Sequence, residues 1–348
     1  MNNIEQQFLQ LINIVNNLQQ RVISLENANY VLLQSNKQLI TTIEANQSEA
    51  ANMRRNLTYE INDPRNKSID FFYPIIDTSE NAIDEIINNG KSLSRFGDGE
   101  FATIAGRIRH KFQTEVDERL SHRLTEVLNC DDEMLMIGIA DNYGNLECYS
   151  EQTQREIRCY MSPTVRIEHQ KLLNPNKKYY NTYVTRPYTT YADFQSNAPA
   201  LRFQSLKRIW DNRDCIFVEG CYTGLGVGND LFNNANSIKR ILCPAVNAFS
   251  QYDKILETCL QQDKNALFLI ALGPTATVLA HDLCKAGYQA VDIGHIDLEY
   301  EWFLKGEGRK SLIVGKYNNE SNEEMVLYPI MDEDYLKQTI ARIGIEEI

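Results

Sequence analysis

The first 57 residues carry an apolar pattern that repeats every seven positions. One series of the repeat comprises Ile4, Leu11, Leu18, Leu25, Leu32 and Leu39. The other series lies four positions after each member of the first and comprises Phe8, Val15, Val22, Asn29, Asn36 and Ile43. Alternating spacings of four and three are those of the d and a positions of a coiled coil, and leucine at d with valine and isoleucine at a favours two parallel strands. Residues 1–57 are therefore predicted to form one long helix that makes a parallel homodimer or docks to a partner enzyme with a matching helix.

A polar segment separates this repeat from the rest of the chain. Neither glycine nor proline occurs before Pro64, which fits an uninterrupted helix up to that region. Pro64 then interrupts a helix because its ring clashes with the preceding turn and it has no backbone N–H to donate. Residues 58–70 are predicted to be a linker, and residues 71–348 are predicted to form the second domain.

From residue 71 onward, short apolar runs alternate with segments of helical periodicity. The expected strands are Ser92–Phe96, Met134–Ile139, Tyr183–Thr185, Cys215–Glu219, Arg240–Cys243, Ala266–Leu272 and Gln289–Ile293. The expected helices include Glu80–Ile87, Val116–Leu128, Ala248–Gln261 and Thr275–Lys285. This alternation predicts βαβ units and an α/β domain whose mostly parallel sheet has helices on both faces. Because ligands of such sheets bind outside the carboxyl ends of the strands, the chemistry is expected in the loops that follow strands.

Composition narrows the classes of partner. The chain has 35 Lys and Arg against 47 Asp and Glu, which gives a net charge of −12. That balance argues against sequence-independent binding to nucleic acid, which needs a basic face. The chain has no apolar run long enough to predict a transmembrane segment and no signal-peptide pattern at its start, and its eight cysteines form no C-x-x-C pair. These features predict a cytoplasmic protein with reduced thiols.

The stretch "SRFGDGEF" places two carboxylates directly after a predicted strand. Asp98 and Glu100 follow Gly97 on a turn that leads into a helical pattern. Alternate residues of an extended turn point the same way, so the two side chains are expected to share one hard cation. The string alone is weak evidence, because Asp131-x-Glu133 and Asp297-x-Glu299 match it in the same chain. Acidic residues are also favoured in a first helical turn by the helix dipole.

Two further loops carry candidate chemistry. In "VEGCYTGLGVGNDLF", the glycines lead toward a predicted helix, an arrangement that can bring backbone N–H groups to a phosphate. Its spacing departs from the G-x-G-x-x-G dinucleotide fingerprint, which weakens a nicotinamide-cofactor interpretation. In "DIGHIDLEYEW", a histidine and several acids follow a predicted strand, which suits a general base or a metal shell.

Five segments together resemble the GT-D-type bacterial glycosyltransferases. That family was formerly catalogued as a domain of unknown function and includes glucosyltransferases of serine-rich repeat adhesin glycosylation. The segments, which lie between about residues 81 and 315, are "SRFGDGEF", "VEGCYTGLGVGNDLF", "SIKRILCPAVNAF", "LIALGPTATVLAHDL" and "YQAVDIGHIDLEYEWF". The resemblance implies a Rossmann-like α/β fold, a UDP-sugar donor with glucose as the expected sugar, and Mn²⁺ or Mg²⁺ as the cofactor.

The resemblance also implies roles for individual residues. The family's Asp-x-Glu metal motif falls on Asp98 and Glu100. His295 and Glu301 are carried over as active-site residues, and the general base is left open among His295, Asp297 and Glu301. The expected donor contacts, assigned from their chemistry, are Arg95, Gly97, Gly224, Gly226, Gly228, Asn229 and Asp230.

These observations favour a metal-dependent glycosyltransferase that acts on a glycan or glycoprotein acceptor. Two alternatives come from other classes. The first is a nucleotide-dependent oxidoreductase that uses the glycine-rich loop. The second is a non-catalytic scaffold in which the coiled coil recruits partners.

Overall fold

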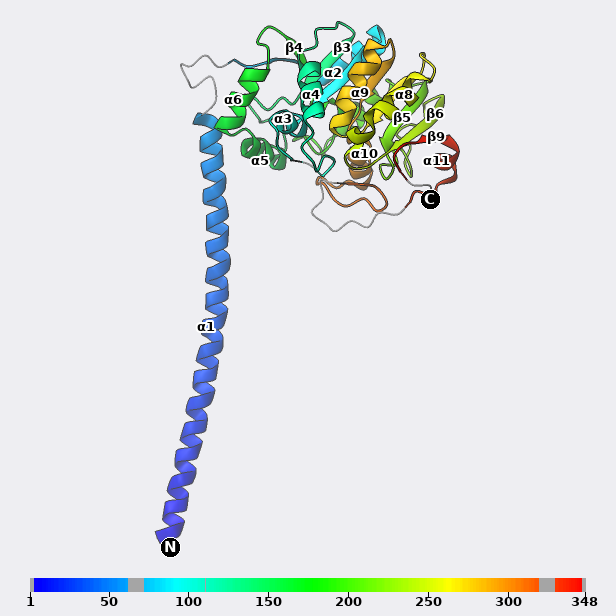
Figure 1. The fold of residues 1–348 in the computed structure, drawn as a ribbon. Coiled ribbons are helices and arrows are strands. Elements are labelled where there is room, and N and C mark those ends of the chain that lie inside the picture. The colour runs from blue at the N-terminus through cyan, green and yellow to red at the C-terminus, as the bar shows by residue number, and fades with distance from the viewer. Residues whose placement is uncertain (1–2, 62–71, 110, 319–328, 346–348) are drawn as a thin grey trace. The chain divides into compact units, whose positions relative to one another are not determined.

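The computed structural model describes residues 3–61, 72–109, 111–318 and 329–345. The chain divides into two compact units, Met1–Glu60 and Ile61–Ile348. A single helix, α1, spans Asn3–Ile61 (Figure 1). The helix therefore includes residues 58–61 of the predicted linker, because the helix-breaking proline lies only at position 64. The rest of that linker, residues 62–70, lies outside the described residues.

The heptad positions of α1 form a seam of apolar side chains that are exposed among the residues that the structure describes. Phe8 is 66% exposed, and Leu18 and Leu25 are 52% and 69% exposed. An isolated helix gains nothing from such exposed apolar side chains, whereas a second helix in register would bury them.

We predict that the full chain is a dimer at micromolar concentration and that Leu18→Glu with Leu25→Glu makes it monomeric. Both substitutions place a charge in the apolar seam at d positions. Sedimentation equilibrium measures the mass directly. The matched control is Gln20→Glu with Asn27→Glu, which adds the same charges at outward-facing f positions and should leave the dimer intact. A monomeric full chain would refute the dimer.

Within the described residues, the second unit contains one nine-stranded sheet in the order β1-β4-β3-β2-β8-β7-β5-β6-β9. The strands are β1 (Ile75–Asp77), β2 (Ser92–Phe96), β3 (Leu135–Ile139), β4 (Lys178–Asn181), β5 (Asp214–Gly220), β6 (Ser237–Cys243), β7 (Leu267–Ala271), β8 (Gln289–Asp292) and β9 (Thr339–Arg342). Every pair of neighbouring strands is parallel. The predicted α/β class and mostly parallel sheet are confirmed.

The two halves of the sheet meet at one junction. Strands β1 to β4 form one half and β5 to β9 form the other, and β2 pairs with β8 through Leu93 and Val291. The crevice beyond the carboxyl ends of such a junction is where open α/β sheets bind ligands.

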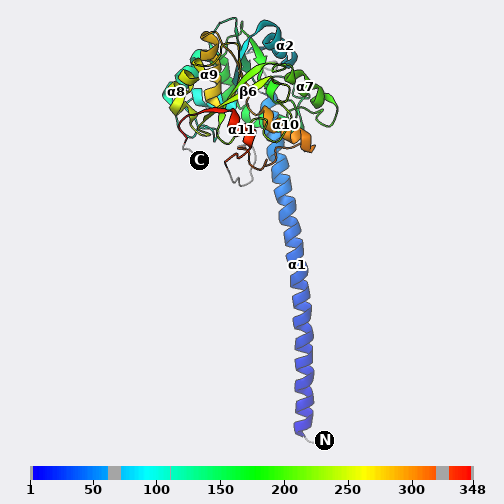
Figure 2. The same ribbon diagram turned by 90° about the vertical axis from the view of Figure 1, so that its right-hand side faces the viewer.

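Helices cover both faces of the sheet. They are α2 (Ser79–Asn89), α3 (Asp98–Ile104), α4 (Glu118–Leu128), α5 (Glu151–Tyr160), α6 (Pro163–Leu172), α7 (Ala198–Lys207), α8 (Tyr252–Leu260), α9 (Pro274–Lys285), α10 (Ile296–Lys305) and α11 (Glu333–Gln338). Figure 2 shows α8 and α9 on one side of the sheet and α2 and α7 on the other. No helix in the described ranges combines the length and the apolar character that crossing a bilayer requires.

Three features of the unit differ from the sequence prediction. The predicted strand Tyr183–Thr185 is wrong, because these residues belong to a 3-10 helix, η2 (Thr182–Thr185), in which the Asn181 side chain accepts a hydrogen bond from the Tyr183 N–H. The predicted helix Ala248–Gln261 is divided into η3 (Ala248–Gln251) and α8. Strands β1, β4 and β9, which have three or four residues each, were not predicted.

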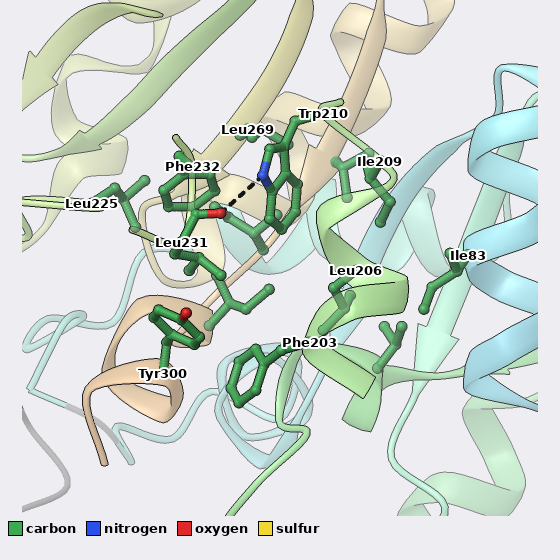
Figure 3. Close-up of a cluster of buried hydrophobic side chains, with 14 of the residues drawn as sticks. Ile83, Phe203, Leu206, Ile209, Trp210, Leu225, Leu231, Phe232, Leu269 and Tyr300 are labelled. Carbon is green, nitrogen blue, oxygen red and sulfur yellow. Dashed lines mark hydrogen bonds between the residues drawn. The ribbon is translucent and has the colours of Figure 1, made fainter. Parts of the chain in front are cut away.

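The glycine-rich loop after β5 is also different, since residues 221–236 form turns and no helix follows the glycines. Apolar side chains anchor this loop in the core, where Leu225, Leu231 and Phe232 pack among buried residues of α7 and the sheet (Figure 3). Trp210 reinforces the anchor by donating a 3.1 Å hydrogen bond from its indole N–H to the Leu231 carbonyl. The loop is thus held by packing against side chains distant in sequence.

Candidate active site

A cavity of about 390 Å³ lies at the carboxyl ends of the central strands. Its walls come from the segments that follow β2, β3, β5, β7 and β8, together with α5 and η2. Representative lining residues are Arg95, Gly97, Asn142, Thr223, Gly273 and Asp292. The cavity therefore occupies the junction between the two halves of the sheet, where the sequence placed the chemistry.

Arg95 and Asp292 lie next to each other across the junction of β2 and β8. The Arg95 Nε is 3.3 Å from Asp292 Oδ1, and an Arg95 terminal nitrogen donates to the Thr185 hydroxyl. Burial raises the pKa of Asp292, although Arg95 opposes that effect. Gly294 makes room for the guanidinium, because a Cβ at this position, whose φ is +48°, would lie 2.1 Å from Arg95 Nη2. Arg95 is therefore a fixed cationic group in the cavity wall.

Asp98 and Glu100 both line the cavity. They lie in the first turn of α3, so the expectation that they project side by side from an extended turn is wrong, since residues i and i+2 of a helix do not face each other. Glu100 accepts a 2.7 Å hydrogen bond from the Gly97 N–H. Asp98 forms an ion pair with Arg109, whose guanidinium lies 4.8 Å from the centre of the Tyr160 ring. Two carboxylates and the Arg109 guanidinium therefore lie on one wall of the cavity.

The glycine-rich loop directs part of its backbone toward the protein's own carboxylates. The Leu225 N–H donates to Glu219 at 2.8 Å, and the Gly226 N–H donates to Asp297 at 2.9 Å. Glu219 in turn forms a buried 2.6 Å ion pair with Arg240. Burial raises the pKa of Glu219, and Arg240 acts in the opposite direction. Two of the amides expected to bind a phosphate are therefore occupied in holding the loop.

Other residues of this loop fall outside the cavity wall. Gly224, Gly226, Gly228, Asn229 and Asp230 are not among the residues that line it. Asp230 instead accepts a 2.7 Å hydrogen bond from Tyr300 and pairs with Lys207 at 3.2 Å. Asn229 donates to both Asp297 and Glu301. The structure thus places Asp230 in a surface cluster and Asn229 beside α10.

Asp297 and Glu301 lie one helical turn apart on α10 and converge on one lysine. Lys316 Nζ is 2.7 Å from Asp297 and 2.9 Å from Glu301. Burial lowers the pKa of Lys316, but the two carboxylates raise it by more, so that the amine remains a cation. Asp297 lines the cavity, whereas Glu301 does not. Because Asp297 accepts from Lys316, Gly226 and Asn229, its oxygens are committed to the fold.

His295 lines the cavity at the N-terminus of α10. Arg186 Nη2 lies 3.0 Å from His295 Nδ1. A guanidinium only donates, so Nδ1 must accept and the hydrogen of a neutral imidazole is assigned to Nε2. Arg186 is itself 4.0 Å from Glu299, whose carboxylate is fixed by the Tyr188 and Thr189 amides. Neutral His295 in this geometry is a hydrogen-bond donor through Nε2.

Behind the cavity wall, His169 lies buried between two tyrosines. The Tyr143 hydroxyl is 2.6 Å from Nδ1, and the Tyr160 hydroxyl is 3.0 Å from Nε2. The Phe101 ring covers the imidazole with a centroid separation of 4.1 Å. Burial lowers the pKa of His169 from 6.5 to about 4, because the charged form is poorly solvated there.

This shift predicts a loss of stability in acid. The unfolded chain protonates His169 near pH 6.5 and the folded chain only near pH 4, so stability is fully present above pH 6.5 and falls as pH decreases between these values. The contribution is about 3 kcal/mol. Urea unfolding at pH 7, 5.5 and 4 should show that His169→Gln reduces the pH dependence by that amount. His122→Gln, at an exposed position, should reproduce the wild-type dependence. An unchanged dependence in His169→Gln would contradict the assignment.

Three site residues were not identified from the sequence. Asp292 had a usable signal, since it ends a strand two residues before Gly294. Arg109 and Lys316 had none, because they lie 11 and 15 residues from the carboxylates that they bind and follow no periodic pattern. Among the described residues, no group of three or more His, Cys, Asp or Glu side chains has a metal-binding arrangement.

Comparison with known proteins gives consistent matches. A family model described as the glycosyltransferase GT-D fold matches residues 93–321. The chain is 38% identical over 270 residues to a probable glycosyl transferase, Gly, of Streptococcus gordonii and 37% identical over 266 residues to glycosyltransferase GlyD of Streptococcus pneumoniae serotype 4. These alignments cover 77% and 76% of this chain but only 38% and 32% of those proteins. The chain thus spans about a third of the length of these curated relatives.

Solved structures give the same result over most of the chain. A glycosyltransferase of domain family 1792 from Streptococcus sanguinis superposes with a TM-score of 0.73 at 36% identity, covering 78% of this chain and all of that one. A second structure, described as showing that this domain has a distinct glycosyltransferase fold, gives a TM-score of 0.71 at 35% identity and covers 78% of this chain and 96% of that one.

Proposed function

Because the chain belongs to the GT-D-fold glycosyltransferase family, we propose that it transfers a sugar, with glucose as the first candidate, from a UDP-sugar to a hydroxyl of a glycan or glycoprotein, with a divalent cation as cofactor. The observation that carries the proposal is the meeting of Asp98, Glu100 and Arg95 in one cavity at the sheet junction. A cavity of about 390 Å³ falls within the range of small-molecule sites.

The residues at the cavity fit a divalent cation. Asp98 and Glu100 supply oxygen donors, which Mg²⁺ and Mn²⁺ prefer. Asp98 and Glu100 would hold the cation, because Mg²⁺-type ions are commonly bound by one or two carboxylates together with substrate phosphates. When bound, such a cation neutralises charge that develops on the departing diphosphate.

The chain's own cations complete the electrostatic part of the mechanism. Arg95 and Arg109 line the same cavity as Asp98 and offer donors to diphosphate oxygens. Arg95 is held in place by Asp292 and Thr185, so its charge needs little reorganisation when the substrate arrives. Arg109 is paired with Asp98, so it would hold a nucleotide diphosphate close to the carboxylate that would hold the cation.

The proposed roles around α10 are revised from the sequence hypothesis. His295 donates a hydrogen bond through Nε2 toward a developing negative charge, because Arg186 occupies Nδ1. Asp297 and Glu301 are positioning residues, because they hold Lys316, Asn229 and the glycine-rich loop against the helix. Neither carboxylate is proposed as a base.

The oxidoreductase alternative has less support from the geometry. A dinucleotide site needs a helix directly after the glycines, whereas residues 221–236 form turns. In addition, the Leu225 and Gly226 amides donate to Glu219 and Asp297.

The direct experiment is UDP release from UDP-glucose by the full chain, measured with Mn²⁺ and with EDTA. We expect turnover with Mn²⁺, loss with EDTA and recovery when Mn²⁺ is added in excess. UDP-galactose and UDP-N-acetylglucosamine serve as competing donors in the same assay. Turnover that persists in EDTA would refute the metal dependence, and a failure to bind or cleave any of the three would favour the scaffold alternative.

A further inference from the structure

A second cavity, of about 340 Å³, opens along the same sheet edge, beside β1, β4 and β3. Its walls include Asp77 at the end of β1, Asn181 at the end of β4 and Asp141 just after β3. Because all of these strands are parallel to β2 and β8, both cavities lie along the carboxyl edge of one sheet.

The two cavities are immediate neighbours. Tyr183 lines both of them, and its hydroxyl donates a 2.6 Å hydrogen bond to the Asn142 side chain, which lines the first cavity. Asp141 lines the second cavity, although it is adjacent to Asn142 in sequence. A chain-like ligand that lies along the sheet edge would thus pass from one cavity to the other across Tyr183.

The second cavity combines an apolar floor with polar groups that suit neutral hydroxyls. The apolar lining consists of Ile76, Ile83, Val184, Pro187, Leu201 and Leu206. Tyr191 adds an aromatic ring, and the Arg202 guanidinium lies 4.1 Å from the centre of that ring. A sugar ring presents apolar C–H faces and a rim of hydroxyls, and such pockets match it with apolar surface and a few placed polar groups.

The charges of the second cavity argue against a phosphorylated ligand. Asp77, Glu80 and Asp141 contribute carboxylates. The cation in the wall, Arg202, is neutralised by a two-pronged pair with Asp193 at 2.8 and 2.6 Å. The first cavity differs in holding three arginines, Arg95, Arg109 and Arg186, of which Arg95 and Arg109 are paired with Asp292 and Asp98.

The strongest indication of a ligand in the second cavity comes from Asp141. Its carboxylate accepts no hydrogen bond and pairs with no cation within the described ranges, whereas Asp77 is held by Asn81 at 2.6 Å and Lys178 at 3.1 Å. Burial raises the pKa of Asp141, with no other cause acting on it. A largely buried carboxylate without donors is unfavourable, and ligand hydroxyls at this position would supply them.

We propose that the second cavity binds a neutral saccharide unit of the acceptor, with Asp141 accepting hydrogen bonds from its hydroxyls. This inference rests on the proposed glycosyl transfer, since an acceptor glycan must approach the donor along an open path. The next unit of the acceptor would extend past Tyr183 into the first cavity, where the reacting hydroxyl meets the donor sugar.

Saturation-transfer NMR on the full chain, with UDP and Mn²⁺ present, tests this proposal with glucose, N-acetylglucosamine and cellobiose as probes. We expect at least one probe to bind, and Asp141→Asn to weaken its binding about 10-fold because a charge-assisted hydrogen bond is lost. Leu201→Trp, which adds bulk to the cavity wall and keeps the Asp141 carboxylate, should also weaken the signal. The matched control is Asp131→Asn, which removes an exposed carboxylate at the opposite end of β3.

UDP affinity, measured by calorimetry with Mn²⁺, distinguishes a failure of the saccharide site from a failure of the proposed transferase function. It should be the same in wild type, Asp141→Asn and Leu201→Trp. If UDP binds but none of the three probes does, or if both cavity variants bind the probe as wild type does, the saccharide site is refuted. If UDP fails to bind wild type, the proposed transferase function is refuted instead, whatever the probes show.

Discussion

Asp98→Asn with Glu100→Gln is expected to reduce kcat for UDP-glucose hydrolysis by about 10³-fold or more. Both substitutions keep the size of the side chain but remove the charge that would hold a divalent cation. Loss of a single preorganised group that stabilises transition-state charge typically costs 10²- to 10³-fold, and a metal ion supplies several kcal/mol of such stabilisation. The measurement is steady-state UDP release at saturating UDP-glucose across a Mn²⁺ titration.

The chain contains its own control for this prediction. Asp131 and Glu133 form the same Asp-x-Glu string, and both side chains are exposed away from the cavity. Asp131→Asn with Glu133→Gln should therefore leave kcat unchanged. Melting temperatures of both double variants check that the fold is intact. Full activity in the Asp98 and Glu100 variant would overturn the metal site, and equal losses in both variants would show that the effect is not specific to it.

The largest expected effect on stability comes from Lys316→Met. This change removes the cation that Asp297 and Glu301 share. The site is buried, since Lys316 and Asp297 are only 6% and 2% exposed. Removal of one member of a buried ion pair costs about 3 to 5 kcal/mol, because the remaining charges stay desolvated. For a domain of this size we expect a decrease in melting temperature of roughly 10 °C, measured by calorimetry.

Two further variants test the cause of that loss. Lys316→Met combined with Asp297→Asn and Glu301→Gln removes the charges together and should recover much of the stability. Lys337→Met removes a lysine that is paired with Glu333 on the surface and should change stability by less than about 1 kcal/mol. If the triple variant is no more stable than Lys316→Met, the buried carboxylates are not the source of the destabilisation.

Local pattern was sufficient for the elements whose burial is continuous. The middle of β5 and the whole of β7 read as apolar runs because both of their faces are covered, and β2 was predicted with the observed bounds. The heptad repeat likewise predicted the helix α1, because a seven-residue apolar period can be recognised without any tertiary contact. Short edge strands such as β1 escaped prediction because a three-residue run carries too little pattern.

The sequence by itself determined the α/β class, the strand ends that meet at the cavity and the family resemblance, because these depend on periodicity and on residue order. Only the tertiary structure decided where the candidate residues lie and which groups they bind. Asp297 and Glu301 were hypothesised as catalytic groups, but both side chains form ion pairs with Lys316. In the glycine-rich loop, two backbone amides donate hydrogen bonds to Glu219 and Asp297. The physical reason is that a carboxylate's role depends on which donors reach it, and here the donors come from segments that no local pattern connects to it.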